Sequence, residues 1–252
     1  MPNLNFLPSC YRSVYKYVLL RWIGFEMFAV FPGCTLEKYS GELKEPLIRI
    51  LEYLGIEWID LGSRCCGMPL LLSGDSEGFR EVIKSNTDHF RNVSVLITSC
   101  AGCFRVFREH YSGFMVKHLS QFILDLGLSS FPCKVNLKAI YHDPCELIHC
   151  GVTEEPRELL KRIPGLTLFE FRLNRGSSTC CGGGGLVKAV FPSLAVEVAY
   201  EKILREIPQD VDAIVSSCPF CYLNFKDSSS IYSLNIRVYD IIHVLGMALG
   251  VL

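Results

Sequence analysis

The 252-residue sequence lacks a long uninterrupted hydrophobic run. The apolar stretch at residues 10–31 is interrupted by four charged side chains: Arg12, Lys16, Arg21 and Glu26. A membrane span needs about 20 residues with few or no charges, and a secretory signal needs a clean apolar centre. The sequence therefore predicts no transmembrane segment, and we expect any membrane association to be peripheral, through a partner. We expect a cytoplasmic protein whose thiols are reduced.

An excess of charge of one sign is also absent, since 25 Lys and Arg residues face 26 Asp and Glu residues. No segment clusters basic residues with interleaved aromatic residues, which argues against a nucleic-acid partner. The sequence has neither a G-x-G-x-x-G motif after a strand nor a G-x-x-x-x-G-K-S/T motif. Nucleotide or flavin binding by this chain therefore has no motif to support it, and any flavin is expected on a partner.

Cysteine, in contrast, is abundant, with 13 residues. Dense cysteine usage often means disulfides in small secreted proteins, but a chain of this length, 50% hydrophobic, can form a core without them. In a reducing compartment the same usage indicates metal or redox chemistry. The spacing of the cysteines has to decide between these uses.

Ten of the cysteines form one pattern that occurs twice: Cys34, Cys65, Cys66, Cys100 and Cys103, then Cys145, Cys180, Cys181, Cys218 and Cys221. Equivalent positions are 111, 115 and 118 residues apart. A small offset that grows along the chain indicates an internal duplication with loop insertions.

Short β-like runs precede the cysteines, and helix-like stretches follow them. The expected strands are residues 28–31, 56–61, 93–98, 138–142, 166–171 and 212–216. Helices are expected at 42–54, 77–90, 156–163 and 194–206, and each half closes with a strand-to-helix segment at 116–127 or 238–250. We predict an α/β fold, internally duplicated, with two similar parallel-sheet units and the cysteines at the carboxyl ends of the strands.

This duplication predicts a first cysteine-rich repeat at 27–130 and a second at 131–252. Residues 1–26 have no counterpart in the repeat, and Met27 directly precedes the first strand. We expect this segment to be either an appended tail or the product of a start codon placed too far upstream.

Three uses of the ten cysteines remain open from the residues alone. They could hold iron–sulfur clusters, they could form Cys₄ zinc sites, or they could be buried as small apolar side chains. Five cysteines per repeat exceed the four that tetrahedral zinc requires. The run Gly182, Gly183, Gly184 and Gly185 could bring backbone N–H groups against a charged cluster, or could simply form a tight turn before a helix.

The sequence gives less support for a functional role of the other cysteines and histidines. Cys10, Cys133 and Cys150 lie outside the pattern and are expected to be bystanders. His142 and Asp143 precede Cys145 at the end of an expected strand, where they could tune a metal site, shuttle a proton or merely form a turn. The other histidines show no metal-binding spacing and are expected to be structural: His89, His110, His118, His149 and His243.

The complete pattern, over about residues 27–250, resembles the CCG cysteine-rich domain family. The flanks of the second repeat strengthen the resemblance, namely His142-Asp143-Pro144-Cys145, Cys180-Cys181 with four glycines, and Ser217-Cys218-Pro219. That family includes the B-type subunit of heterodisulfide reductase and the cysteine-rich iron–sulfur subunits of glycolate, lactate and glycerol-3-phosphate dehydrogenases. Glu146 departs from it, because many relatives have a histidine there.

The resemblance implies that all ten cysteines are ligands of two [4Fe-4S] clusters, which are noncubane in the B-type subunit of heterodisulfide reductase. It implies an electron-transfer or disulfide-reducing subunit of an oxidoreductase complex. Many relatives carry a fused ferredoxin domain, whereas residues 1–33 hold only Cys10. A ferredoxin-like partner equivalent to the C-type subunit, a flavin-containing redox subunit, or both are therefore expected. The alternatives are an iron–sulfur relay for a flavin-dependent hydroxy-acid or glycerol-3-phosphate dehydrogenase, and a zinc-binding scaffold without redox function.

Overall fold

The computed structural model describes residues 27–252 except residues 40, 63 and 209. The expectations for residues 1–26, including Cys10, lie outside the described residues. The first half contains β1 (Phe28–Phe31), α2 (Cys34–Tyr39), α3 (Gly41–Tyr53), β2 (Ile59–Asp60), α4 (Met68–Ser73), α5 (Ser76–His89), β3 (Val95–Thr98), α6 (Ala101–His110), β4 (Met115–His118) and α7 (Leu119–Asp125).

The second half repeats this order of elements. It contains β5 (Leu137–His142), α8 (Cys145–His149), α9 (Glu155–Lys161), β6 (Leu166–Glu170), the 3₁₀ turn η2 (Arg175–Ser177), α10 (Val187–Val190), α11 (Pro192–Glu206), β7 (Ala213–Ser216), α12 (Pro219–Ile231), β8 (Arg237–Asp240) and α13 (Ile241–Leu249).

Two parallel sheets with the same topology form the framework. Their strand orders are β2-β1-β3-β4 and β6-β5-β7-β8. The registers also correspond, since Ala29 of β1 pairs with strands on both sides, and so does Ala139 of β5. The predicted duplicated α/β fold is confirmed.

The strands follow the sequence pattern closely, with one clear exception. β1, β3 and β7 are buried along their whole length, as continuous apolar runs in a parallel sheet covered on both faces should be. The strand expected at 56–61 is shorter, because β2 comprises only Ile59–Asp60. Its start is tied to the end of α3 instead, because the N–H of Ile56 donates to the carbonyl of Leu51 at 3.0 Å, after Gly55 has turned the chain with a φ of 65°.

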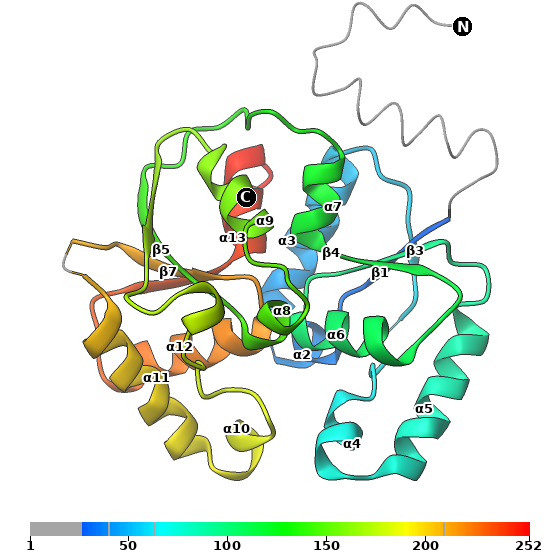
Figure 1. Cartoon of the computed structure of the whole chain (residues 1–252). Helices are drawn as coiled ribbons and strands as arrows, with labels where there is room; N and C mark the ends of the chain where they lie inside the picture. The colour runs from blue at the N-terminus through cyan, green and yellow to red at the C-terminus, as the bar shows by residue number, and fades with distance from the viewer. Residues whose placement is uncertain (1–26, 40, 63, 209) are drawn as a thin grey trace, which may run out of the picture.

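The helices α3, α7, α9 and α13 lie between the two sheets (Figure 1). α3 packs against α13, and α7 packs against α9, so each contact joins the two halves. The largest apolar cluster runs from β1 and α3 through α7 to β5, α9 and α13, and includes Leu47, Phe122, Leu160 and Leu245. The two repeats therefore share one core.

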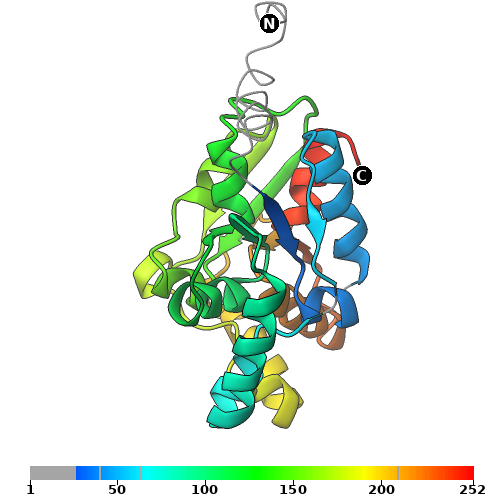
Figure 2. The same ribbon diagram turned by 90° about the vertical axis from the view of Figure 1, so that its right-hand side faces the viewer.

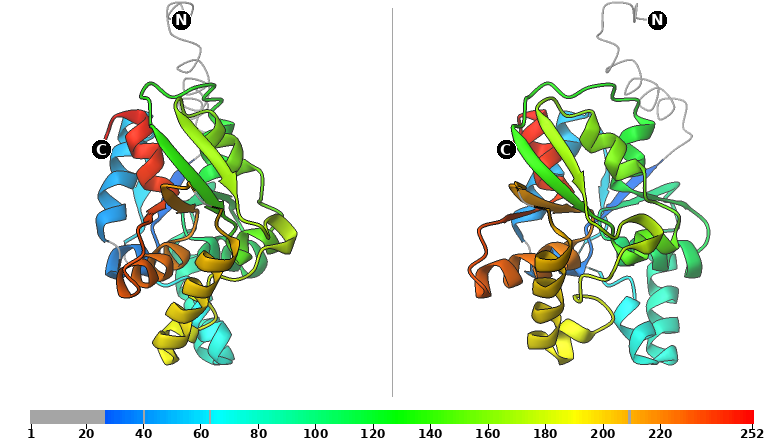
Figure 3. Two further views of the ribbon diagram at one scale, coloured as in Figure 1. Left: turned by 90° about the vertical axis from the view of Figure 1, so that its left-hand side faces the viewer. Right: turned by 60° about the vertical axis from the view of Figure 1, so that its left-hand side comes forward.

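The helices that begin at the cysteine turns lie below the sheets in Figure 1, at the carboxyl ends of the strands. α4 with α5 and α10 with α11 extend beyond them on the same side, away from the C-terminus (Figures 2 and 3). Within the described part of the chain, no helix has both the length and the hydropathy needed to cross a membrane.

Candidate metal centre

The first cysteine of each set opens a helix directly after the first strand of its sheet. Cys34 is the first residue of α2, and Cys145 is the first residue of α8. The C-x-x-C pairs follow the third strand of each sheet, with Cys100 and Cys218 as N-cap residues of α6 and α12. Their extended backbone ends the strand and starts the helix, which places the second cysteine of each pair in the first turn.

The five thiols of the first repeat form a continuous chain in which each thiol lies close enough to its neighbour to shift its pKa. The order is Cys34, Cys65, Cys66, Cys103 and Cys100. The structure thus brings together all five cysteines that the sequence predicts for the first site.

The second repeat reproduces this chain at equivalent positions. Its order is Cys145, Cys180, Cys181, Cys221 and Cys218, and the Sγ atoms of Cys181 and Cys221 are 3.2 Å apart. The predicted second site is therefore assembled in the same way as the first.

The two chains of thiols meet at Cys100 and Cys218, which lie close enough that each shifts the pKa of the other. Helix packing produces this contact, since α6 packs on α8 and α12 packs on α2 across the two halves. The ring of His118 lies beside this junction: its Nε2 atom is 3.3 Å from the carbonyl oxygen of Ser99, the residue before Cys100, and the backbone of Ser217, the residue before Cys218, influences its pKa. The two sites are neighbours, which the sequence pattern did not reveal.

Backbone amides of the cysteine turns point at the sulfur atoms. The N–H of Gly67 donates to Sγ of Cys65 at 3.4 Å. In the second repeat the N–H groups of Gly182 and Gly183 donate to Sγ of Cys180 and Cys181, at 3.3 and 3.4 Å. Amide hydrogen bonds to cluster sulfur stabilise negative charge and raise a reduction potential.

The glycines of the second turn differ in how strictly their positions require glycine. Gly182 has a φ of 84°, and a Cβ atom there would lie 2.8 Å from the carbonyl oxygen of Ala195. A Cβ atom on Gly183 would lie 2.9 Å from Cβ of Asn224, whereas one on Gly184 would meet no atom within 4 Å. The proposed contact of all three glycines with a cofactor stays a prediction, and this geometry supports it for Gly182 and Gly183.

The family model of the cysteine-rich domain, CCG, matches residues 28–108 and 139–226. The chain belongs to the CCG cysteine-rich domain family. This confirms the resemblance seen in the cysteine spacing, and the two matched segments each contain one five-thiol set.

Curated relatives of this CCG chain include reductase subunits and a lactate utilization protein. It is 33% identical over 238 residues to the D subunit of dihydromethanophenazine:CoB–CoM heterodisulfide reductase from Methanosarcina acetivorans, covering 87% of this chain and 58% of the relative. It is 33% identical over 227 residues to the B subunit of fumarate reductase (CoM/CoB) from Methanothermobacter marburgensis, covering 86% and 45%. The chain thus spans about half the length of these two relatives.

Lactate utilization protein A of Bacillus velezensis is more distant but similar in length. It is 24% identical over 236 residues, covering 86% of this chain and 98% of the relative.

Burial differs along the two CCG thiol chains. Six thiols are buried, and they belong to Cys66, Cys100, Cys103, Cys181, Cys218 and Cys221. Cys34, Cys65 and Cys145 are half-buried, and Cys180 is exposed. Each set therefore extends from buried thiols at the junction to thiols near the surface. The second set is the more exposed to solvent, because Cys180 is exposed.

Thiol–thiol hydrogen bonds split the pKa values within each set. The hydrogen bond from Cys103 lowers the pKa of Cys100 to about 5, and the one from Cys145 lowers the pKa of Cys180 to about 2. The same bonds, together with burial, raise the pKa values of the partners Cys103 and Cys145. Because metals bind thiolates, binding at these sites must release the shared protons.

Buried asparagines hold the adjacent-cysteine turns in both repeats. The Asn86 side chain donates to the carbonyl of Cys65 at 2.9 Å, and Tyr111 donates to the carbonyl of Cys66 at 3.1 Å. Asn224 donates to the carbonyl of Cys181 at 2.7 Å. Sequence reasoning missed these residues. Only Asn224 had a detectable signal, because it lies one helical turn after Cys221.

A buried ion-pair network anchors the turn that carries Cys145. The guanidinium of Arg157 is fully buried and contacts both carboxylate oxygens of Asp143, at 2.6 and 2.7 Å. It also binds Glu170 at 2.7 Å, while the N–H of Arg175 donates to Asp143 at 2.8 Å. This supports the turn-forming role for Asp143. Its neighbour His142 is different, because burial lowers its pKa to about 3 and keeps the imidazole neutral.

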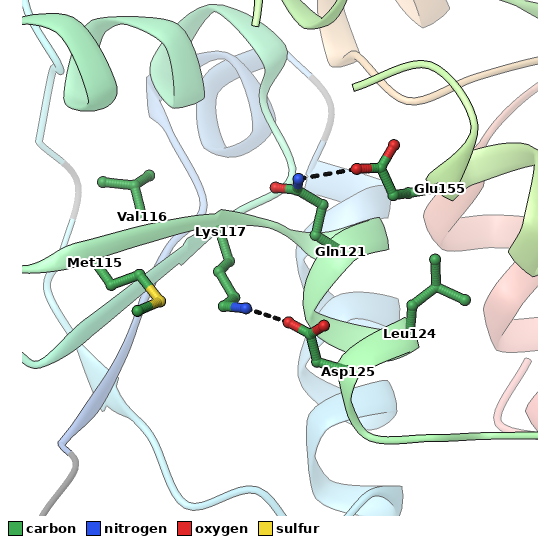
Figure 4. Close-up of a pocket in the computed structure, with 7 residues that line it drawn as sticks. All are labelled: Met115, Val116, Lys117, Gln121, Leu124, Asp125 and Glu155. Carbon is green, nitrogen blue, oxygen red and sulfur yellow. Dashed lines mark hydrogen bonds and ion pairs between the residues drawn. The ribbon is translucent and has the colours of Figure 1, made fainter. Parts of the chain in front are cut away.

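Two further cysteines and a surface pocket lie apart from these thiols. The carbonyl of Cys150 accepts from Arg108 at 2.8 Å, and Cys133 lies beside Gly250. Figure 4 shows the pocket beside β4 and α7, where Lys117 pairs with Asp125, and Gln121 donates to Glu155 at 3.0 Å. None of the ten cysteines lines it, so the cysteine sets remain the candidate functional site.

Proposed function

We propose that this protein is an iron–sulfur electron-transfer subunit of an oxidoreductase complex, of the disulfide-reducing type resembling heterodisulfide reductase. Each five-thiol set would hold one [4Fe-4S] cluster, of the noncubane type by that resemblance. The observation that carries the proposal is the pair of equivalent thiol chains that meet at Cys100 and Cys218.

The residues fit such clusters in three respects. Each set offers five sulfur ligands on short turns, one more than a tetrahedral zinc site uses. Amides of Gly67, Gly182 and Gly183 already donate to the sulfur atoms. The six buried thiols belong to the two smaller apolar clusters, one for each set, which exclude water. When bound, the clusters take up and release single electrons.

Partners are part of this proposal, because a subunit of this kind needs an electron source. The relatives named as heterodisulfide reductase and fumarate reductase subunits are about twice as long as the part that matches. A ferredoxin-like subunit of the C type, a flavin-containing subunit, or both would supply the electrons in the cytoplasm. Such a partner would reach the second site from the side on which Cys180 is exposed.

A second candidate is an iron–sulfur relay for a flavin-dependent hydroxy-acid dehydrogenase. The observation that favours it is the match to lactate utilization protein A over 98% of that protein's length. Purification together with native partners separates the two. Electron transfer from lactate through a flavin subunit supports the relay, whereas partner-dependent reduction of a disulfide supports the leading proposal.

The test of cofactor content is anaerobic purification with metal and sulfide analysis. Two four-iron clusters predict about eight irons per chain with matching acid-labile sulfide. Cys150→Ser, which changes a thiol outside both sets, should leave this content unchanged. About four irons would mean that only one set is filled. Zinc without sulfide would replace the proposal with the zinc-binding scaffold.

A further inference from the structure

The second cysteine set contains a buried histidine without a hydrogen-bond partner. His142 is the last residue of β5 and is 1% exposed. Among the described residues, neither Nδ1 nor Nε2 of its ring has a partner. Burying a polar group without a partner costs stability, and buried polar atoms are normally paired. A metal bound at the site would give one of these ring nitrogens a partner.

The distances around His142 fit a metal. One ring nitrogen and the Sγ atoms of Cys181 and Cys221 all lie within 4.8 Å of one another. A tetrahedral metal with bonds of about 2.0–2.3 Å to nitrogen and sulfur holds such atoms roughly 3.5–3.8 Å apart. The three donors can thus share one metal atom with small adjustments of the side chains.

The first repeat has a phenyl ring at the position equivalent to this histidine. Phe31 is the last residue of β1 and precedes Cys34 by three residues, as His142 precedes Cys145. Both rings occupy the same aromatic environment. Phe31 packs edge-on against Phe107 at 4.8 Å, and His142 packs edge-on against Phe225 at 4.9 Å. Only the second site has an imidazole where the first has a phenyl ring.

No nearby cation prevents this imidazole from binding a metal, among the residues that the structure describes. Lys202 lies over the neighbouring ring of Phe171, with Nζ 4.7 Å from the ring centroid. Its charge is compensated, because Nζ pairs with Glu206 at 3.1 Å and donates to Thr179 at 2.7 Å.

We infer that His142 is a metal ligand of the second cysteine set, so that this set has five sulfur donors and one nitrogen donor while the first has sulfur alone. This deepens the proposed function and rests on it for the iron–sulfur identity of the metal. Because only the second centre would have a neutral nitrogen donor, the two centres would differ in reduction potential. The neutral imidazole of His142 would thus bind the metal of the second set, which is the set with the exposed thiol, Cys180.

Pulsed EPR on the reduced, anaerobically purified protein tests the inference. With histidine labelled by ¹⁵N, the second centre should show a strongly coupled nitrogen that is lost in His142→Phe. Phenylalanine is the residue of the first repeat and fits this aromatic environment. His149→Phe changes an exposed histidine on α8 and should keep the coupling. Only weak nitrogen coupling in the wild-type centre would overturn the assignment.

A second variant guards against misfolding of His142→Phe. His142→Cys keeps a ligand of higher negative charge, so it should retain the wild-type iron content, lose the nitrogen coupling and lower the midpoint potential of the second centre. An unchanged potential, with the signal of the first centre intact, would contradict ligation.

The metal content distinguishes failure of the inference from failure of the proposed function. Clusters without histidine coupling refute the ligand alone. If the wild-type protein holds zinc and no sulfide, the proposed function fails. In that case the visible spectrum of the cobalt(II)-substituted protein tests ligation by His142 directly. His142→Phe should change this spectrum, and His149→Phe should not. Identical spectra of all three proteins would refute ligation there too.

Discussion

Gly182 and Gly184 stand in the same glycine run but differ in what a methyl group would meet. Gly182→Ala should destabilise the protein by about 2–4 kcal/mol, because left-handed strain adds to a clash with the carbonyl of Ala195. It should also reduce the metal content of the second site. Gly184→Ala should stay within about 0.5 kcal/mol of wild type, since its Cβ enters open space. Urea unfolding measures both, and equal losses would contradict this account.

At single residues, predictability from sequence depended on repetition. The ten thiols were identified because equivalent spacings recur at offsets of 111 to 118 residues. Asn86 and Arg157 do not recur at equivalent positions of the other repeat. Their importance comes from their burial, which only the tertiary fold determines. The contact between Cys100 and Cys218 could not be predicted either, because it depends on how the halves pack.

Arg157 connects three elements around the second site, namely α9, β6 and the turn before α8. Arg157→Ala should cost about 3–5 kcal/mol, because it leaves the buried carboxylate of Asp143 without its partner. Arg205→Ala is the matched control. Its pair with Glu201 is largely exposed, so about 0.5 kcal/mol or less is expected. The free energy of unfolding in urea gives both values, and similar values would show that the network contributes little.

The elements themselves were largely predictable, since strands and crossover helices have different apolar periodicities. The packing of α3 against α13 could not be predicted, because a helix pattern shows which face is apolar but not which helix covers that face. Short elements such as α10, with four residues, carry too little periodicity to be recognised.

For the whole molecule, Glu42 of α3 links the first half to the second. It accepts hydrogen bonds from Lys226, at 2.6 Å, and from Tyr222. The hydrogen bond from Lys226 lowers the pKa of Glu42 below its ordinary value. Because the folded-state pKa is depressed, its stabilisation is present above the unfolded pKa of about 4.3 and is lost as the pH falls through the folded pKa.

Glu42→Gln should therefore cost about 1 kcal/mol or less near neutral pH, since the pair is half-exposed, and the cost should vanish in acid. Unfolding in urea at several pH values tests this, with the exposed Glu52→Gln on the same helix as control. A cost that grew toward low pH would have the wrong sign.

The junction of the two thiol chains makes a final prediction about the whole molecule. Cys66→Ser should remove iron from the first site alone, because Cys66 contacts only thiols of its own set. Cys100→Ser should remove the first site as well, and should in addition shift the EPR signal of the second, since Cys100 contacts Cys218. Cys181→Ser should affect the second site without this reciprocal shift. Iron analysis and EPR on the three variants test this. If Cys66→Ser and Cys100→Ser leave the same second-site signal, the sites do not influence each other through the junction, and the shared core alone unites the halves.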